Sequence, residues 1–175
     1  MHSLIELSPY GKNGEMRMVV ETPRGSNIKL EYEPKLRAFT VSRALPLGLV
    51  YPYDWGFIPG TKGEDGDPID ALALHEGATY PGVVLPCRAL GVVDLVQEGI
   101  NGPVGNPRVI LMPVWHDRMG EFENASDLPS RLKEEIEQFF LSATFFTDKK
   151  AKVTGWRGPK AVDKLISASL IGKST

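Results

Sequence analysis

The chain has 175 residues, which is the length of one typical domain and is long enough to bury a hydrophobic core. Hydrophobic residues make up 42% of the sequence and charged residues 24%, so the composition excludes disordered, collagen-like and coiled-coil proteins. The 20 basic and 22 acidic residues give a formal charge of -2, which provides no general attraction for nucleic acid or an anionic membrane. We therefore expect one domain over residues 1–175, with no nucleic-acid and no membrane partner.

The cellular location is predicted from cysteine content and from the N-terminal residues. The single cysteine, Cys87, excludes an internal disulfide and a cysteine-based metal cluster, and it fits a reducing compartment. The first residues, MHSLIELSPYG, contain no basic segment followed by an apolar run. No apolar run reaches the roughly 18 residues that a membrane-spanning helix needs. We expect a cytoplasmic protein.

The first part of the chain has the period of β-strands. Residues 16–20 (MRMVV) predict a strand that ends before Pro23. The next segment alternates with a period of two, with apolar residues on one face and charged residues on the other: Ile28, Leu30 and Tyr32 against Lys29, Glu31 and Glu33. After a turn at residues 34–35, a second strand has Phe39, Val41 and Arg43 on the same side. The segment therefore predicts a β-hairpin.

Residues 45–70 lack a sustained period and contain four Pro and five Gly, so we expect a long loop with a functional role. Further strands are expected over 71–74, 83–95 and 109–114. Helical spacing appears late: Leu132, Ile136, Phe139 and Phe140 follow Pro129, and a similar pattern starts at Val162 and precedes Gly172. This order predicts an α+β fold in which helices cover a small barrel or curled sheet.

The segment 64–70 (EDGDPID) concentrates carboxylates at a turn. Two such groups about 4 Å apart repel by about 4 kcal/mol at an effective dielectric constant of about 20, and a cation would relieve that repulsion. An EF-hand is excluded because Ile69 and Asp70 occupy loop positions that need a ligand and a glycine. Oxygen ligands without His or Cys favour Mg²⁺, Mn²⁺ or Ca²⁺ over zinc. The alternative is a solvated acidic turn. Asn substitutions at Asp65 and Asp70 should each abolish metal binding without harming folding.

Cations on the predicted hairpin suggest the ligand. Lys29 and Glu31 share its polar face, and Arg43 lies on the partner strand. An ordinary surface hairpin also has this pattern. Together with metal-binding carboxylates, however, Lys, Arg and Tyr are the residues that phosphoryl transfer needs, because they neutralise phosphate oxygens while a metal activates water.

Four segments resemble one family in order and spacing: VVETPRGSNIKLEYE, FTVSR, YPYDWGFIPGT and EDGDPIDALAL. They are similar to the soluble inorganic pyrophosphatases of the bacterial type, family I. The resemblance implies an OB-like five-stranded β-barrel with flanking α-helices. It also implies Mg²⁺-dependent hydrolysis of diphosphate to two phosphates, with Mn²⁺ as a possible substitute, and a homo-oligomer, which is a hexamer in bacteria.

The same resemblance assigns roles to residues of this chain. Asp65 and Asp70 correspond to metal ligands, and Asp67 corresponds to the group that accepts a proton from the attacking water. Glu21 and Glu31 correspond to acidic residues that hold an outer metal or its waters. Lys29 and Arg43 correspond to the cations that bind diphosphate, and Tyr51 corresponds to a hydroxyl that supports the site. Arg108 retains the positive charge of a substrate-binding lysine of the family.

Several family positions are altered in this chain. Gln97 and Asn106 replace two metal-binding aspartates, so at least one metal should bind less tightly or be absent. A Tyr-Lys pair that contacts diphosphate is replaced by Ala143 and Thr144, unless Lys149 or Lys150 reaches the site, and Trp55 stands in place of a tyrosine. Distant carboxylates could substitute for the missing ligands, for example Asp94, Glu98 or Asp117.

Three functions remain open at this point. The first is hydrolysis of inorganic diphosphate, with a reduced rate. The second is hydrolysis of another phosphoanhydride or of a phosphate ester, whose larger group would occupy the space at residues 143–144. The third is a non-catalytic relative that binds metal and phosphate, or that assembles with a true pyrophosphatase.

Overall fold

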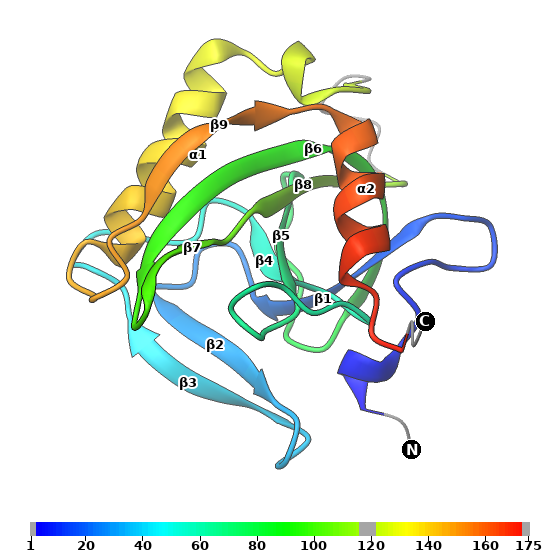
Figure 1. Ribbon diagram of the computed structural model, residues 1–175, viewed down its shortest axis with the longest axis horizontal. Coiled ribbons are helices and arrows are strands. Elements are labelled where there is room, and N and C mark those ends of the chain that lie inside the picture. The colour runs from blue at the N-terminus through cyan, green and yellow to red at the C-terminus, as the bar shows by residue number, and fades with distance from the viewer. Residues whose placement is uncertain (1–2, 116–121, 173–175) are drawn as a thin grey trace.

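A closed ring of five strands forms the centre of the computed structural model, which describes residues 3–115 and 122–172 (Figure 1). The ring follows the order β1, β4, β5, β8, β6 and returns to β1. Its strands are β1 (Met16–Thr22), β4 (Asp54–Ile58), β5 (Ile69–Ala73), β8 (Arg108–Pro113) and β6 (Val84–Gly99). All neighbours in the ring are antiparallel except β5 and β8, which are parallel. The predicted α+β fold with an OB-like five-stranded barrel is confirmed.

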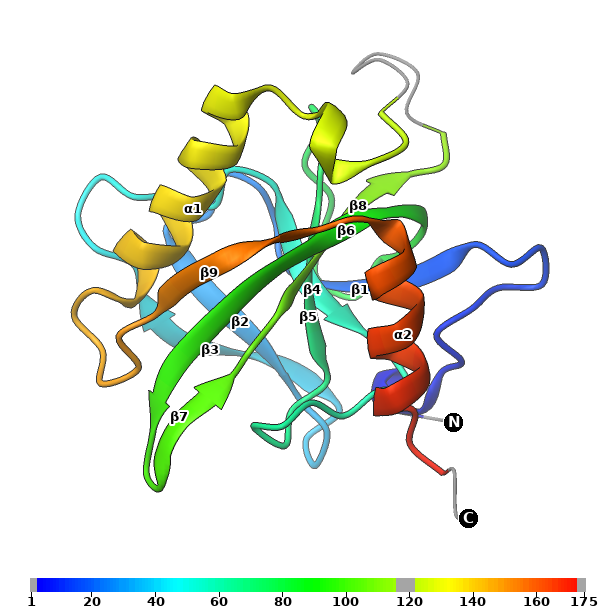
Figure 2. The same ribbon diagram turned by 45° about the horizontal axis from the view of Figure 1, so that its top comes forward.

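The strand β6 extends beyond the ring and organises two further strands. Its last residues pair with β7 (Gly102–Gly105) in a hairpin, and residues 92–96 pair with β9 (Lys152–Arg157). Figure 2 shows β9 lying along β6 between the two helices. These strands were not expected from the sequence, because β7 is only four residues long and Gly155 interrupts β9.

The two helices cover separate apolar clusters. Helix α1 (Ser130–Thr144) follows Pro129 and buries Ile136, Phe139, Phe140 and Ala143 against one cluster. Helix α2 (Pro159–Ser169) buries Val162 and Ile166 against the other. Successive residues of β5 and β8 alternate between these clusters, so both strands are buried on two faces. Two short 3-10 helices, η1 (Leu4–Glu6) and η2 (Ala125–Asp127), complete the elements.

The expected long loop over residues 45–70 is wrong as a description of that whole segment. It contains β4 and the start of β5. All five residues of β4, DWGFI, are buried, so the strand lacks the polar-apolar alternation that identifies a half-buried strand. The expected strands at 71–74, 83–95 and 109–114 are present with shifted ends, as β5, β6 and β8.

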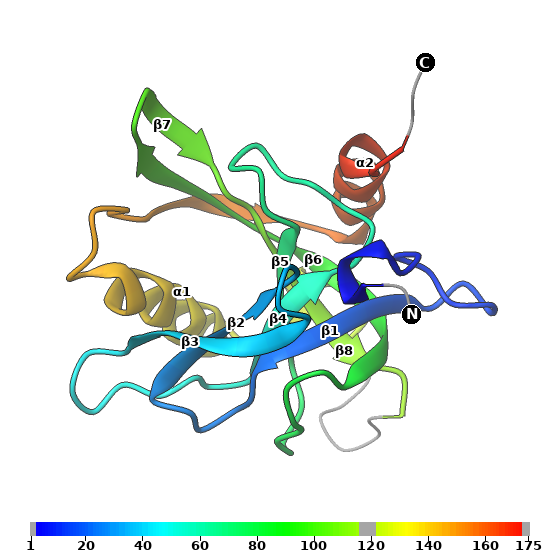
Figure 3. The same ribbon diagram turned by 90° about the horizontal axis from the view of Figure 1, so that it is seen from below.

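The predicted hairpin forms its own two-stranded sheet from β2 (Ile28–Glu33) and β3 (Ala38–Ala44). Figure 3 shows it beside the barrel, next to α1. Side chains of β1 anchor it: the Tyr32 N–H donates to Glu21 Oε1 at 2.8 Å, and the Leu30 N–H donates to Thr22 Oγ1 at 2.9 Å.

A β-bulge in β3 changes the expected position of Arg43. Lys29 pairs with Arg43, whereas Leu30 pairs with Val41, so Ser42 is an extra residue. Because a bulge reverses the side-chain alternation beyond it, Arg43 does not continue the face of Phe39 and Val41. Both Ser42 and Arg43 instead line the cavity described below. The predicted common face of Phe39, Val41 and Arg43 is therefore wrong.

Within residues 3–115 and 122–172, every helix is too short or too polar to cross a membrane. Cys87 is a free, fully buried cysteine in β6.

Barrel closure between β1 and β4 depends on Gly56. A Cβ atom at this position would lie 1.8 Å from the Val19 carbonyl oxygen, so β1 would have to move away. We predict that Gly56→Ala lowers the free energy of unfolding by about 3 kcal/mol, the upper end for overpacking. The matched control is Gly155→Ala in β9, where no atom lies within 4 Å of the new Cβ, and its change should stay within about 0.5 kcal/mol. Urea unfolding of both variants measures the two changes in stability. Equal stabilities would contradict the view that barrel closure depends on Gly56.

Candidate functional site

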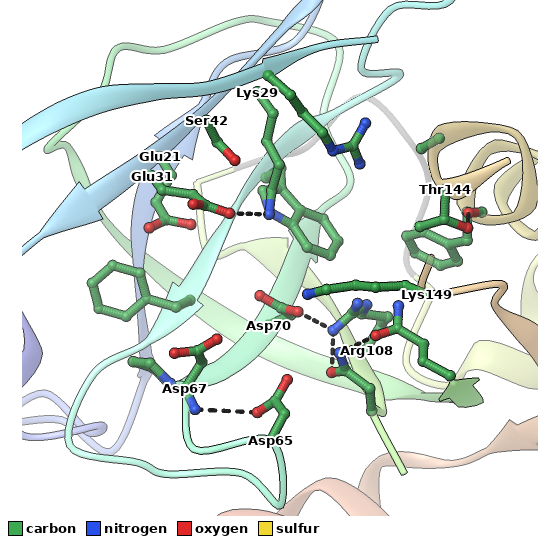
Figure 4. Close-up of a pocket in the computed structure, with 18 of the residues that line it drawn as sticks. Glu21, Lys29, Glu31, Ser42, Asp65, Asp67, Asp70, Arg108, Thr144 and Lys149 are labelled. Atoms are coloured by element: carbon green, nitrogen blue, oxygen red, sulfur yellow. Dashed lines mark hydrogen bonds and ion pairs between the residues drawn. The ribbon is translucent and has the colours of Figure 1, made fainter. Parts of the chain in front are cut away.

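One cavity of about 570 Å³ lies between the hairpin, the barrel and the end of α1. Its lining includes all nine residues that the sequence analysis assigned to a site: Glu21, Lys29, Glu31, Arg43, Tyr51, Asp65, Asp67, Asp70 and Arg108. Figure 4 shows labelled acidic and basic side chains from different elements facing the same space. The structure thus brings these residues together, while their individual roles remain predictions.

The acidic turn is held by local hydrogen bonds. The Gly63 N–H donates to the Asp67 carbonyl at 2.7 Å, and the Asp67 N–H donates to Asp65 Oδ1 at 3.1 Å. Gly66 has φ = 92°, a left-handed conformation that favours glycine. Burial and the nearby Asp65 carboxylate raise the pKa of Asp67. The turn therefore places the Asp65 carboxylate close enough to disfavour ionisation of Asp67.

The hairpin side of the cavity contains two glutamates in different environments. Burial raises the pKa of Glu21 to about 7, although the N–H of Tyr32 opposes this change. Glu31 forms an ion pair with Lys29, drawn in Figure 4. Burial also acts to raise the pKa of Glu31, but Lys29, the Ser42 hydroxyl and the charge of Lys149 together outweigh it, so the pKa is lowered. Lys29 is thus engaged within the protein before any ligand binds.

Arg108 is the most constrained cation in the cavity. It donates to the carboxylate of Asp70 and to the side-chain oxygen of Asn106, and its guanidinium lies 5.1 Å from the ring centroid of Trp55. The parallel register of Ala71 with Val109 makes Asp70 and Arg108 neighbours on adjacent strands. Burial lowers the pKa of Arg108 to about 10, so the guanidinium stays charged at neutral pH.

The two altered ligand positions form a buried amide pair. Asn106 Nδ2 donates to Gln97 Oε1 at 2.9 Å, and only 7% of Asn106 and 6% of Gln97 is exposed. With Arg108 they form a continuous chain of hydrogen bonds from Asp70 to Gln97.

Arg43 and Tyr51 complete the predicted set. Among the described residues, no hydrogen bond or ion pair engages the Arg43 guanidinium, which leaves its donors available to a ligand. Tyr51 is buried and packs edge-on against Phe139, with ring centroids 5.1 Å apart. Burial raises the pKa of Tyr51, so its hydroxyl stays protonated at neutral pH.

The structure also shows where Ala143 and Thr144, which replace the Tyr-Lys pair, and Lys149, a candidate replacement for its lysine, are located. Ala143 is buried, and the Thr144 hydroxyl donates to the Phe140 carbonyl of its own helix at 3.1 Å. Lys149 lines the cavity, and Figure 4 shows its side chain extending into it. Its carbonyl accepts the Glu98 N–H at 2.7 Å, which ties its loop to β6. The position of Lys149 depends on this contact with a residue far away in sequence. The sequence alone therefore could not decide whether Lys149 or Lys150 reaches the site.

Neither Asp94 nor Glu98 replaces the missing ligands. Asp94 accepts two hydrogen bonds from Arg157, at 2.6 and 2.7 Å, on β6 and β9. Glu98 is exposed and is not part of the cavity lining. Asp117 lies outside the described residues.

The cavity offers a divalent cation the right kind of ligand, since its carboxylate oxygens are hard donors without a neighbouring His or Cys. Within residues 3–115 and 122–172, however, no three Asp, Glu, His or Cys side chains converge as a ready-made metal site. Asp70 and Glu31 instead contact Arg108 and Lys29. The donor set therefore fits Mg²⁺ in chemistry, with protein cations balancing part of its charge.

Comparisons with known proteins point to one family. The family model described as inorganic pyrophosphatase matches residues 18–171. The chain is 40% identical over 158 residues to the inorganic pyrophosphatase of Thermus thermophilus, covering 89% of this chain and 88% of that protein. A crystal structure of the inorganic pyrophosphatase from that organism has a TM-score of 0.87 at 38% identity, covering 96% and 97% of the two chains. A structure of the Helicobacter pylori inorganic pyrophosphatase has a TM-score of 0.84 at 28% identity, covering 93% and 95%.

The two aspartates that were expected to behave alike under substitution differ in their surroundings. Asp70 forms an ion pair with the buried Arg108, whereas Asp65 interacts with Arg108 only at longer range and also repels Asp67. We predict that Asp70→Asn lowers the free energy of unfolding by about 2 kcal/mol, below the value for a fully buried pair because Asp70 is 23% exposed. Asp65→Asn should leave it unchanged or raise it. Urea unfolding with a chelator present tests both, and equal effects would show that the ion pair contributes little.

Proposed function

This chain belongs to the inorganic pyrophosphatase family, and we propose that its cavity hydrolyses diphosphate to two phosphates with Mg²⁺ as the metal. The observation that supports this most directly is the convergence of carboxylates and cations on one cavity of about 570 Å³. A highly charged anion needs cations around it, and divalent metals need carboxylates, so a diphosphate–metal complex matches both sets.

Divalent metal use is general in the family, and the identity of the metal is part of the proposal. The residues that would hold Mg²⁺ are Asp65, Asp67 and Asp70, with Glu21 and Glu31 on the hairpin side. When bound, the metal would neutralise phosphate charge and lower the pKa of water. Mn²⁺ also prefers oxygen ligands and would substitute.

The protein groups then perform distinct tasks. Arg43 donates hydrogen bonds to the diphosphate oxygens, and Lys29 supplies a second cation on the opposite strand of the hairpin. The Tyr51 hydroxyl, which stays protonated, donates a hydrogen bond to the diphosphate. Asp67 accepts a proton from the attacking water, whose oxygen forms a bond to one phosphorus while the bridging P–O bond breaks. The freed oxygen becomes part of the second phosphate.

Lys149 supplies part of the diphosphate binding that Ala143 and Thr144 cannot provide. It is the cation that lines the cavity on the side of α1, and its charge acts on both Glu31 and Asp67. A single flexible ammonium is a weaker clamp than the family's Tyr-Lys pair, so hydrolysis is slower than in relatives that have the pair.

We also include a homo-oligomer and a cytoplasmic location in the proposal. An exposed apolar patch at the end of α1 and the 46–49 loop, formed by Leu47, Leu49, Leu141, Phe145 and Phe146, suits contact with a second copy, and the family resemblance suggests a hexamer. The free, buried Cys87 fits a reducing compartment. The chain would act as one domain, since hairpin, barrel and α1 all contribute to one cavity.

Phosphate release from diphosphate with Mg²⁺ or Mn²⁺ tests the function directly. We expect turnover of diphosphate and little release from nucleotides or phosphate esters. Turnover only of an organic phosphate would select the second function considered above, and no turnover of any compound would select a binding role.

Substitution of the hairpin cations should weaken diphosphate binding. We predict that Lys29→Ala and Arg43→Ala each cost about 1.5 to 3 kcal/mol of binding free energy, the worth of a hydrogen bond to a charged group. The effect should be larger for Arg43, since Lys29 must first leave Glu31. Lys35→Ala is the control, because Lys35 lies on the exposed turn of the same hairpin outside the cavity. Calorimetric titration with a non-hydrolysable diphosphate analogue measures all three, and equal affinities would exclude the hairpin from the binding site.

The oligomer is tested at the apolar patch. Phe146 is 81% exposed, so Phe146→Asp should not disturb the fold but should shift the protein toward monomers, because it places a charge in the contact. Ile100→Asp is the control, an equally exposed apolar residue at the β6–β7 turn. Sedimentation velocity gives the result, and unchanged assembly of the Phe146 variant would place the contact elsewhere.

A further inference from the structure

The carboxylates of the cavity fall into two groups with different counter-charges. Asp70 bonds directly to the guanidinium of Arg108. Asp65 and Asp67, on the adjacent turn, have no such partner among the described residues, and their mutual repulsion raises the pKa of Asp67 after the effect of burial. Asp70 is thus in direct contact with a cation, whereas Asp65 and Asp67 interact with Arg108 and Lys149 only at longer range.

Arg108 is fixed in place by contacts on several sides. Its bonds to Asp70 and Asn106 set the direction of the guanidinium, and the face of the Trp55 ring covers it. Asn106 is itself held by Gln97 at 2.9 Å. Only 7% of Arg108 is exposed, so the guanidinium is not free to turn toward a ligand as an exposed arginine would.

The neutral amides at positions 97 and 106 determine the charge balance around this guanidinium. Arg108 bonds to one carboxylate, Asp70, so these two residues together are neutral. Asn106 accepts a hydrogen bond from Arg108 and donates one to Gln97, so the two amides form hydrogen bonds without adding charge. A divalent cation between Asp70 and Asn106 would meet the fixed guanidinium and two weak amide ligands, so it would be repelled there, whereas the side of Asp70 that faces Asp65 stays open to a metal.

We infer that Arg108 is a built-in cation that takes the place of one divalent ion, so that metal binds at the Asp65–Asp67 side of the cavity and not between Asp70 and Asn106. The predicted role of Arg108 as a direct substrate ligand is then replaced by a positioning role: it holds Asp70 and balances its charge. This inference deepens the proposed function and rests on it for the identity of the metal, but metal binding without diphosphate tests it separately.

Four proteins test the inference by Mn²⁺ titration without diphosphate: the parent, Asn106→Asp, Arg108→Gln and the double variant. Calorimetry gives affinity, and electron paramagnetic resonance counts bound Mn²⁺. We expect Asn106→Asp to bind as many ions as the parent, because the fixed guanidinium of Arg108 still lies beside the new carboxylate and occupies the space that a second metal ion would need. The double variant should bind one additional ion, or bind Mn²⁺ at least tenfold more tightly, because the resident charge is gone. If the single variant Asn106→Asp binds an additional ion, the inference is overturned. Unchanged Mn²⁺ binding in the double variant would also overturn it.

Two controls separate this effect from general electrostatics and from misfolding. Lys149→Gln removes one positive charge from the same cavity without touching Asp70 or Arg108; because Lys149 acts on Asp67, Mn²⁺ should bind more tightly while the number of bound ions stays that of the parent, and an additional bound ion would overturn the inference. Circular dichroism checks that each variant folds.

Should the Arg108 variants fail to fold, anomalous scattering from Mn²⁺ in crystals of the parent decides the question. We expect Mn²⁺ at Asp65 or Asp67, and Mn²⁺ coordinated by Asn106 or Gln97 would overturn the inference. Loss of diphosphate turnover with the expected Mn²⁺ count would instead contradict only the proposed function.

Discussion

The buried ion pair between Asp70 and Arg108 is the interaction on which the cavity depends. It joins β5 and β8 at the one parallel pairing of the barrel, where the register of Ala71 with Val109 makes the two residues neighbours. Burying a guanidinium is costly unless a carboxylate and further acceptors compensate it. That requirement accounts for the arrangement around it, because Asn106 supplies the second acceptor and the Trp55 ring covers the remaining face.

The barrel and the hairpin contribute opposite kinds of chemistry. The barrel supplies the acidic turn and Asp70, while the hairpin supplies Lys29 and Arg43. They meet because side chains at the end of β1, Glu21 and Thr22, accept backbone N–H groups of β2. Charges of both signs are therefore held around one space by elements that are far apart in sequence, and some of them form ion pairs there.

The fold class and the members of the site could be predicted from the sequence because both depend on local patterns and on a family signature. The EDGDPID turn and the alternating hairpin are such patterns, and the structure brings their residues to one cavity. Three features depend on non-local contacts and could not be predicted. β4 is buried on both faces, the bulge at Ser42 redirects Arg43, and Arg108 is turned inward by a partner 38 positions away.

The division of the cavity between two sheets has a consequence for how its ligand preference can evolve. The hairpin is a separate two-stranded sheet, so substitutions on its polar face alter the anion that is recognised without disturbing the hydrogen bonds that close the barrel. The barrel strands tolerate far less, since β4, β5 and β8 are packed on both faces. Evolution can therefore alter the ligand preference by changing the few half-buried hairpin residues that line the cavity, while the acidic turn and Arg108 on the barrel stay unchanged.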